Sequence, residues 1–497
     1  MATVAKEEVL ALLQQLSHDI RDLDVGSSVD RHQKLPVVQF LRDYVAANKP
    51  VVLTGVVSHW PAYANWNDEY LCQVAGDTEV TVALTPNGRA DAVTPLPSSC
   101  GAGLGSASSE ATSPGSGSPT AAAAEAAVSG LAGSCSENGG GRAAARGNGA
   151  GTAGHEECFA LPHQVKMPLR DFLALLRSSR QNPSGSNDST AELAGGGRVV
   201  PYLQYQNSSL TAEVPQLLGD IDLLLSWATQ AFGGLPEAVN LWIGDERSVT
   251  SWHSDPFENI YAVVAGSKTF TLMPPAELYR MRLRQYSQAS MQRLCRRHPA
   301  ILANIARVRL ARATYKPVGG SAPAGSREAV EAVASGAAAL APALHDPPER
   351  VLWSSVLPTP DMRQQQQQQQ CRAAVEGGLH QPGKAPAAAP ARDLFADPSL
   401  PPPLVVTVKA GEALYLPAKW WHQVEQEPDA SGRAIAVNYW YDMKFDVKAA
   451  YLQAVERLAE LLGLNEPPPP PPTPRLREAA GADAQLRPPY TGTRALG

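Results

Sequence analysis

The stretch SVTSWHSDPFENIYAVVAGSKTF, residues 248–270, contains the pattern that decides the fold. Its β-branched and aromatic residues, with a turn at Gly266-Ser267, predict short strands. Alternate side chains of a strand share a face, so His253 and Asp255 should point the same way. Two such neighbours can bind one metal ion, and a second histidine would complete a set of two histidines and one carboxylate. That set leaves three adjacent coordination positions open, as in non-haem Fe(II) oxygenases.

The candidate for the third ligand is His422, in LYLPAKWWHQV at residues 414–424. It lies at the end of a predicted strand, between tryptophans and Val424. A core histidine packed among aromatic side chains is the alternative interpretation of His422, and an HxD triplet alone also arises by chance. The triplet His155-Glu156-Glu157 lies in Gly/Ala-rich sequence with no predicted strand, so we do not consider it a metal site.

Lys268 strengthens the metal-site hypothesis. It alternates in phase with Phe270 and Leu272, which predicts that it projects into an apolar interior. A buried ammonium is costly without a partner, and no carboxylate lies within two residues of it. A bound dicarboxylate would supply that partner. The alternative is a lysine near a turn whose ammonium extends to solvent.

Further polar residues could bind a ligand beside the metal. Thr250 begins the segment that contains His253 and offers a hydroxyl group. Tyr202 shares a strand face with Gln204, although a core tyrosine is the alternative. Asn259 and Asn438 interrupt apolar strands and are candidates for supporting amides, with turn residues as the alternative.

The chain alternates between globular and low-complexity sequence. Residues 158–179, CFALPHQVKMPLRDFLALLRSS, predict a helix, and 446–464 predict a closing amphipathic helix with Tyr451, Val455, Leu458 and Leu462 on one side. We divide the chain into an N-terminal helix with flanking strands (1–96), a disordered Gly/Ala/Ser-rich insert (97–157), a helical segment with the first half of a β-domain (158–316), a low-complexity insert with a glutamine run (317–400), the second half of the β-domain (401–445), the closing helix (446–464) and a disordered Pro-rich tail (465–497).

Composition excludes several classes of function. The net charge of −6 and pI near 6.0 give no basic surface for direct nucleic-acid binding, and no apolar run is long enough to span a membrane. The N-terminus predicts an amphipathic helix rather than a targeting peptide. The six cysteines form no CxxC pair, which argues against disulfide frameworks and zinc fingers. We therefore expect a reducing, cytoplasmic location, with the nucleus as an alternative.

Several motifs together resemble the JmjC branch of the cupin superfamily. These are the HSD triplet, Lys268 thirteen residues after Asp255, AGEALYLPAKWWHQV at 410–424 and AVNYWYD at 436–442. The resemblance is greatest to the JmjC-only lysyl hydroxylases. It implies a mainly β fold, a double-stranded β-helix (jelly roll) with flanking N- and C-terminal helices. The two inserts depart from the compact family pattern, because His253 and His422 are 169 residues apart. Loop-closure entropy grows slowly with length, so such an insertion is tolerable.

The resemblance also implies residue roles and a reaction. His253, Asp255 and His422 would bind Fe(II), and Lys268 would pair with the distal carboxylate of 2-oxoglutarate. Thr250 and Tyr202 would assist Lys268, while Asn259 and Asn438 would line the cosubstrate pocket. O₂ and 2-oxoglutarate would be consumed, succinate and CO₂ released, and one oxygen inserted into the substrate. In the lysyl hydroxylases the target is C3 of a lysine in developmentally regulated, translation-factor-class GTP-binding proteins.

Other functions stay open on the sequence. A JmjC lysine demethylase would use the same site, although this chain has no cysteine clusters for reader modules. A metal-dependent peptidase acting on histone-like tails would leave Lys268 and Thr250 without a role, and the chain has no HExxH helix. A non-catalytic cupin would not need all three ligands. The closing helix is either part of the core or the interface of a homodimer, and the resemblance favours the dimer.

Overall fold

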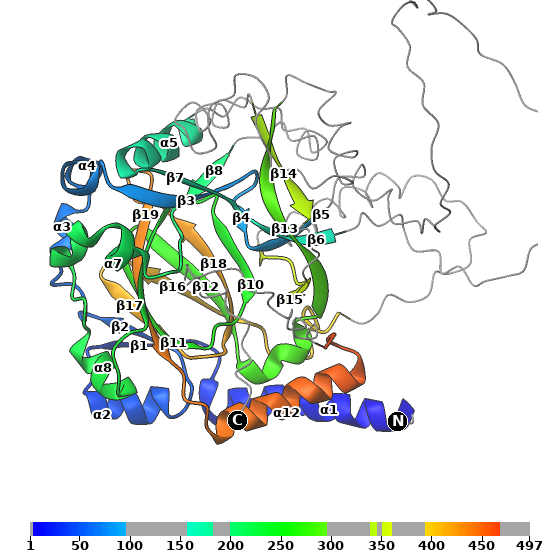
Figure 1. Ribbon diagram of the computed structural model, residues 1–497. Coiled ribbons are helices and arrows are strands. Elements are labelled where there is room, and N and C mark those ends of the chain that lie inside the picture. Colours follow the sequence, from blue (N-terminus) through cyan, green and yellow to red (C-terminus); the bar gives the residue numbers. More distant parts are fainter. Residues whose placement is uncertain are drawn as a thin grey trace, which may run out of the picture.

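Two facing β-sheets form the centre of the computed structural model, which describes residues 3–95, 157–181, 199–295, 338–344, 350–359 and 393–467 (Figure 1). One sheet has the order β1 (Asp30–Gln33), β2 (Val51–Thr54), β17 (Glu412–Leu416), β11 (Phe257–Ala265), β19 (Ala434–Asp442) and β9 (Ala238–Gly244). The other has the order β16 (Leu404–Lys409), β12 (Ser267–Met273), β18 (Trp421–Glu427), β10 (Val249–His253) and β4 (Arg89–Ala90). The expected mainly β fold, the double-stranded β-helix of cupins, is confirmed.

The interior between the two sheets follows the period-two pattern of the strands. Phe270 and Leu272 of β12 pack there with Tyr261 and Val263 of β11. In the register of β12 with β18, Lys268 lies opposite Gln426 and Leu272 opposite His422. Directly opposed residues share a face, so Lys268, Gln426 and His422 all point into the interior together with Leu272.

The outer face of the six-stranded sheet is covered by short helices, which gives the molecule its largest apolar core. Phe40 is central to this core, with its ring 5.0 Å from Tyr415 and 5.3 Å from Trp227. The helical segments are α2 (Val37–Phe40), a π-helical turn (Leu41–Val45), α3 (Ala62–Asn65), α4 (Asp68–Ala75), α7 (Ser209–Glu213), a 3-10 turn (Pro215–Asp220) and α8 (Ser226–Phe232).

Helices from the two ends of the chain lie side by side below the barrel (Figure 1). They are α1 (Thr3–Ile20), which continues as a π-helical turn (Arg21–Val25), and α12 (Val447–Leu462). Both pack on the 3-10 turn Pro275–Arg280. The α12 residues Val455, Leu458 and Leu462 belong to this cluster, whereas Tyr451 is 67% exposed. Most of the predicted apolar stripe is thus core within the chain.

A separate sheet flanks the barrel beside β10. It contains β5 (Ala92–Pro95), β6 (Glu157–Leu161), β13 (Leu283–Cys295), β14 (Ala338–Leu344) and β15 (Arg350–Ser354). The last two strands fall in the range 317–400, which we assigned to a low-complexity insert outside the β-domain, so that assignment did not foresee the strands at 338–344 and 350–354. Both strands pair with β13, so backbone hydrogen bonds to a neighbouring strand hold residues whose composition predicted no structure.

The helix predicted at 158–179 begins only at Leu169. Residues before it form β6 and β7 (His163–Pro168), and β7 pairs with β3 (Glu79–Thr85), which also pairs with β8 (Val200–Tyr202). The prediction was wrong here because β7 buries alternate residues, Val165 and Met167, against a sheet. The helix that does form is α5 (Leu169–Gln181).

Some segment boundaries lie close to the predicted ones. Asn465 is buried and its Oδ1 accepts a hydrogen bond from the Leu283 backbone, so the first residues of the predicted tail belong to the fold. The predicted disorder of 97–156, and of 468–497, lies outside the described residues, as do most of 317–400 and the glutamine run. Of the helices that the structure describes, none is long and apolar enough to cross a bilayer.

Candidate metal and cosubstrate site

The three predicted ligands come together at one end of the barrel interior. His253 ends β10 and lies opposite His422 of β18, with ring centroids 4.1 Å apart. Asp255 Oδ2 is 3.6 Å from His253 Nε2 and 3.9 Å from His422 Nε2. One ligand atom from each residue lies within 4.8 Å of the others. This is a spacing that one metal ion can bridge.

Asp255 reaches this cluster by a different route from the one expected. We predicted that a continuous strand would place it beside His253, but β10 ends at His253 and Asp255 lies in the following loop. Its backbone oxygen accepts a hydrogen bond of 2.8 Å from Lys419 N. Lys419 has a left-handed φ of +67°, so a tight turn before β18 holds the Asp255 loop in place.

Hydrogen bonds orient both histidine rings. Nδ1 of His253 lies 2.8 Å from the Ser251 carbonyl oxygen, and Nδ1 of His422 lies 3.0 Å from the Trp420 carbonyl oxygen. A carbonyl oxygen can only accept, so each Nδ1 carries the proton and each Nε2 presents a lone pair toward Asp255. Histidine ligands of metals are usually fixed by such a bond from the other ring nitrogen.

Burial keeps His422 in the uncharged form that can bind a metal cation. The pKa of His422 is lowered well below its usual value, first by burial and then by the nearby His253. His422 is therefore neutral at physiological pH, and its lone pair stays free. Two imidazoles and one carboxylate fit a divalent iron ion, as a 2-His-1-carboxylate set.

A β-bulge brings Thr250 to the same interior. Thr250 lies opposite Val424, and the register between β10 and β18 shifts between Thr250 and His253. Residues three apart in a regular strand face opposite sides. The extra residue of the bulge turns both Thr250 and His253 toward the interior.

Lys268 lies deeper in the same interior and is fully buried. Its Nζ donates to the Tyr202 hydroxyl at 3.2 Å and to Gln426 Oε1. Both partners are neutral, and none of the carboxylates in the described parts of the chain pairs with it. Burial lowers the pKa of Lys268 to about 7 and raises the pKa of Tyr202. Tyr202 therefore stays protonated, and a bound carboxylate would be the first anionic partner of Lys268.

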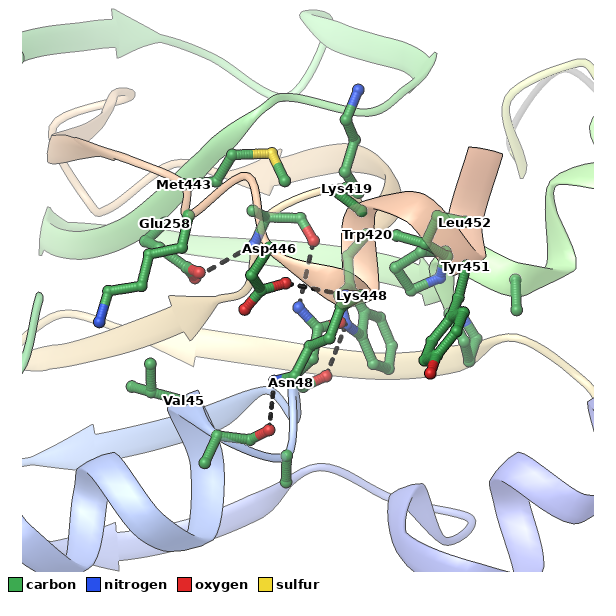
Figure 2. A pocket seen from close by; sticks show the side chains of 18 of the residues that line it. Val45, Asn48, Glu258, Lys419, Trp420, Met443, Asp446, Lys448, Tyr451 and Leu452 are labelled. Atoms are coloured by element: carbon green, nitrogen blue, oxygen red, sulfur yellow. Dashed lines mark hydrogen bonds between the residues drawn. The ribbon is translucent and has the colours of Figure 1, made fainter. Parts of the chain in front are cut away.

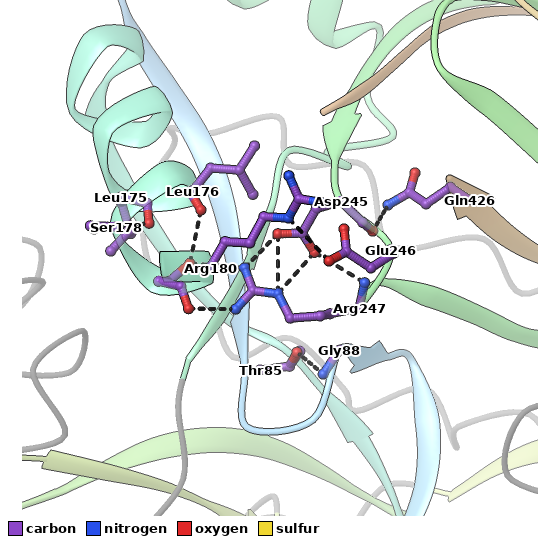
Figure 3. A network of polar contacts seen from close by, with 11 residues as sticks. Thr85, Gly88, Leu175, Leu176, Ser178, Arg180, Asp245, Glu246, Arg247 and Gln426 are labelled. Carbon is purple, nitrogen blue, oxygen red and sulfur yellow. Dashed lines mark hydrogen bonds and ion pairs between the residues drawn. The ribbon is translucent and has the colours of Figure 1, made fainter. Parts of the chain in front are cut away.

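The Lys268 end is held by a polar network at the end of β9 (Figure 3). Gln426 Nε2 donates to the Asp245 carbonyl oxygen at 2.6 Å. The Asp245 carboxylate pairs with Arg247, which also donates to the Ser179 carbonyl oxygen of α5 at 2.9 Å. This network fixes Gln426, and Gln426 in turn fixes the direction of Lys268.

Asn259 and Asn438 also face the interior, where they form a buried amide ladder. Asn438 Nδ2 donates to Asn259 Oδ1 at 3.2 Å. Asn438 Oδ1 accepts from Trp242 Nε1 at 2.7 Å and from Asn240 Nδ2 at 3.3 Å. The ladder links β11, β19 and β9, so these asparagines are not turn residues and they support the interior wall.

The structure adds residues that the sequence analysis missed. Gln426 lies four residues after His422 in one strand, so the period-two pattern could have placed it on the interior face. Trp353 of β15 stacks parallel to His253, with centroids 6.2 Å apart and 4° between the planes. Asp91 lies beside β10. No motif in the sequence marked these last two, because they come from segments far from the ligands.

A separate hollow of about 620 Å³ lies at the foot of the barrel (Figure 2). Its lining includes Val45, Asn48, Trp420 and Tyr451. Trp420 Nε1 donates there to the Asn48 side chain at 2.8 Å. None of the three predicted metal ligands lines this hollow, so the chemistry of the site is elsewhere.

Comparisons with known proteins agree with this geometry. The model of the cupin-like domain family matches residues 37–447. The chain is 32% identical to the Arabidopsis thaliana protein named lysine-specific demethylase JMJ32, over 90% of this chain and 91% of that protein. It is 28% identical to the Homo sapiens protein named bifunctional peptidase and (3S)-lysyl hydroxylase JMJD7, over 94% and 100%. JmjC domain-containing protein E of Dictyostelium discoideum is 26% identical over 89% and 92%.

Proposed function

The chain belongs to the cupin-like, JmjC-type family of Fe(II)- and 2-oxoglutarate-dependent oxygenases, and from that premise we propose that it is a protein lysyl hydroxylase. The observation that carries the proposal is the pairing of two sites in one interior. Three ligand atoms converge at one end, and an ammonium group without an anionic partner is buried at the other.

Different residues of this chain would bind the metal and the cosubstrate. His253, Asp255 and His422 would hold Fe(II), which activates O₂ with 2-oxoglutarate as the reductant when both are bound. Lys268 would bind the distal carboxylate of 2-oxoglutarate, with Tyr202 and Thr250 as hydroxyl donors. The apolar interior excludes water from this ion pair and so strengthens it.

Hydroxylation at C3 of a lysine is supported by likeness to a protein named as a (3S)-lysyl hydroxylase, which matches over its whole length. We propose a translation-factor-class GTP-binding protein of the developmentally regulated type as the substrate. We further propose a cytoplasmic location, with the nucleus as the alternative, and a homodimer that uses the exposed side of α12, where Tyr451 lies.

Mass spectrometry of a candidate GTP-binding protein tests the proposal. The protein is incubated with the enzyme, Fe(II), 2-oxoglutarate and O₂, and succinate is measured in parallel. We expect one added oxygen on a lysine and one succinate per oxygen inserted. The matched control is His253→Ala, with His59→Ala as a histidine variant outside the site. If the enzyme forms succinate but the GTP-binding protein stays unmodified, that protein is not the substrate, and the oxygenase assignment still holds.

Lysine demethylation is the second candidate, because the plant relative at 32% identity is named a lysine-specific demethylase. The same reaction mixture with mono-, di- and trimethyl-lysine peptides distinguishes the two activities. A demethylase would release formaldehyde and leave a peptide lighter by a methyl group. A hydroxylase would leave a heavier peptide and release no formaldehyde. The peptidase alternative predicts shortened peptides without any need for 2-oxoglutarate.

A further inference from the structure

Asp91 lies in the bend between β4 and β5, beside the strand that contains His253. β4 runs parallel to β10, with Ala90 opposite Thr250. The next residue, Asp91, accepts a hydrogen bond of 2.8 Å from Ser251 Oγ on its backbone oxygen. Ser251 lies two residues before His253, and adjacent strands are about 4.8 Å apart. The backbone of Asp91 is therefore offset from that of β10 by roughly one strand spacing.

The Asp91 carboxylate forms no ion pair with the residues that the structure describes, although His253 lies near enough to favour its charged form. Its one hydrogen-bond donor there is Gln204, whose Nε2 lies 3.3 Å from Oδ2. The residue keeps partial contact with solvent, while burial raises the pKa of its carboxyl group to about 6. At neutral pH it is mostly ionised, and a carboxylate in such surroundings gains free energy from binding a cation.

The backbone at Asp91 is also held in a restricted conformation. Its φ is +52°, in the left-handed region that few residues other than glycine, asparagine and aspartate adopt. The Ser251 and Gln204 hydrogen bonds hold this conformation from two directions. The carboxylate is thus fixed in position rather than placed on a free loop.

Aromatic side chains connect the segment after Asp91 to the metal ligands. The chain leaves Asp91 into β5, where Val93 lies opposite Phe159 of β6. The Phe159 ring lies 4.6 Å from Trp353, and Trp353 stacks on His253. Strand pairing and ring contacts therefore lead from the segment after Asp91 to the ligand His253. Trp353 is contributed by β15, the strand inside the second insert.

We propose that Asp91 binds the terminal ammonium of the target lysine and that Trp353 contacts its methylene stem. This inference rests on the proposed lysyl hydroxylase function and names the residue that selects the substrate side chain. A lysine oxidised at C3 has its ammonium several bonds from the reacting carbon, so its counter-ion must be offset from the metal, as Asp91 is. An N-methyl group to be oxidised would instead bring the nitrogen itself to the metal.

The test measures binding rather than turnover. The full chain is loaded with Mn(II) and 2-oxoglutarate without O₂, and titrated with Nα-acetyl-lysine-N-methylamide or its norleucine counterpart. Asp91→Asn keeps the shape and the left-handed backbone but removes the charge. We expect the wild-type chain to bind the lysine probe about tenfold or more tightly than the norleucine probe, and Asp91→Asn to lose this preference. Asp77→Asn, at an 89% exposed carboxylate, is the matched control.

Each other outcome overturns the inference. A wild-type chain that binds both probes equally, or binds neither, has no ammonium site. If Asp91→Asn still binds the lysine probe more tightly than the norleucine probe, the ammonium binds at another residue. If Asp91→Asn weakens Mn(II) or 2-oxoglutarate binding as much as it weakens binding of the lysine probe, Asp91 only positions the site and does not bind the ammonium. Trp353→Leu should weaken both probes alike, because it contacts only the stem.

The proposed function fails in a different experiment. If the lysine probe binds through Asp91 but no lysine gains oxygen when Fe(II) and O₂ are supplied, the ammonium site stands and the hydroxylase does not. If a lysine is hydroxylated equally by wild type and Asp91→Asn, the hydroxylase stands and the ammonium site does not.

Discussion

The two ends of the barrel interior differ in their contact with water. At the metal end, the side chains of His253 and Asp255 are 17% and 25% exposed. At the other end, Lys268 is 0% exposed and its partners are also buried. Under the proposed function, the end where O₂ and a substrate would arrive is open, and the end that would anchor the cosubstrate is closed. The predictions below test whether these two ends are separable.

Removal of a metal ligand should have the largest effect. For His253→Ala we expect loss of stoichiometric Fe(II) binding. Changes to groups that only orient a metal ligand typically lower activity roughly 10–100-fold, and we expect a larger fall in 2-oxoglutarate turnover here. Metal analysis and succinate release measure it. His59→Ala should behave as wild type, and a His253→Ala chain that retains its iron would contradict the assignment.

Lys268→Met should affect the closed end alone. Leaving one partner of a buried ion pair uncompensated costs about 3–5 kcal/mol, so 2-oxoglutarate should bind about 100-fold or more weakly. Fe(II) binding should be unchanged, and thermal stability should be equal or higher because an apolar side chain replaces a buried amine. Calorimetric titrations with Fe(II) and with 2-oxoglutarate measure the two affinities separately. Lys166→Met, at an exposed position of β7, is the control, and equal loss of both ligands would show that the ends are not separable.

Gly244→Ala should disturb the closed end less severely. A Cβ on Gly244 would lie 2.6 Å from Tyr202 Cδ2 and 2.7 Å from Gln426 Nε2. Overpacking of this kind costs about 1–3 kcal/mol, so we expect 2-oxoglutarate affinity to fall roughly 5- to 100-fold. Gly219→Ala, where a Cβ meets open space, should change nothing. Unaltered 2-oxoglutarate affinity in Gly244→Ala would place the cosubstrate away from Tyr202 and Gln426.

The smallest effect is a pH dependence of cosubstrate affinity. Burial lowers the pKa of Lys268 to about 7 in the free protein, and a bound carboxylate raises it. The binding free energy from this ion pair is therefore fully present below pH 7. It falls as pH rises through the bound-state pKa, by up to about tenfold in affinity per pH unit. Titrations from pH 6 to 9 measure it, and Lys268→Met should abolish the slope.

Local rules predicted the short strands and marked His253, Asp255 and His422 as candidate ligands, while the resemblance to JmjC proteins implied the double-stranded β-helix. Strand alternation and turn residues marked β11, β12 and β18, and the same alternation placed Lys268 with Phe270 on the interior face. The route of Asp255 was not predictable, because the end of β10 depends on the bulge opposite β18. The flanking sheet was missed since β14 and β15 are strands only through pairing with β13. Trp353 and Asp91 could not be found for the same reason.

The register of β12 with β18 also sets the length of the molecule that the interior can take. Gln426, opposite Lys268, lies four residues from His422 on one strand, about 13 Å along the backbone at 3.3 Å per residue. His422 and Lys268 thus lie on one strand pair, and a metal bound by His422 would be held at a set distance from the Lys268 ammonium. The interior should distinguish diacids by chain length, favouring 2-oxoglutarate over the shorter oxaloacetate and the longer 2-oxoadipate. A deletion of one residue between His422 and Gln426 would turn one of them to the outer face, and would abolish the selectivity together with the site.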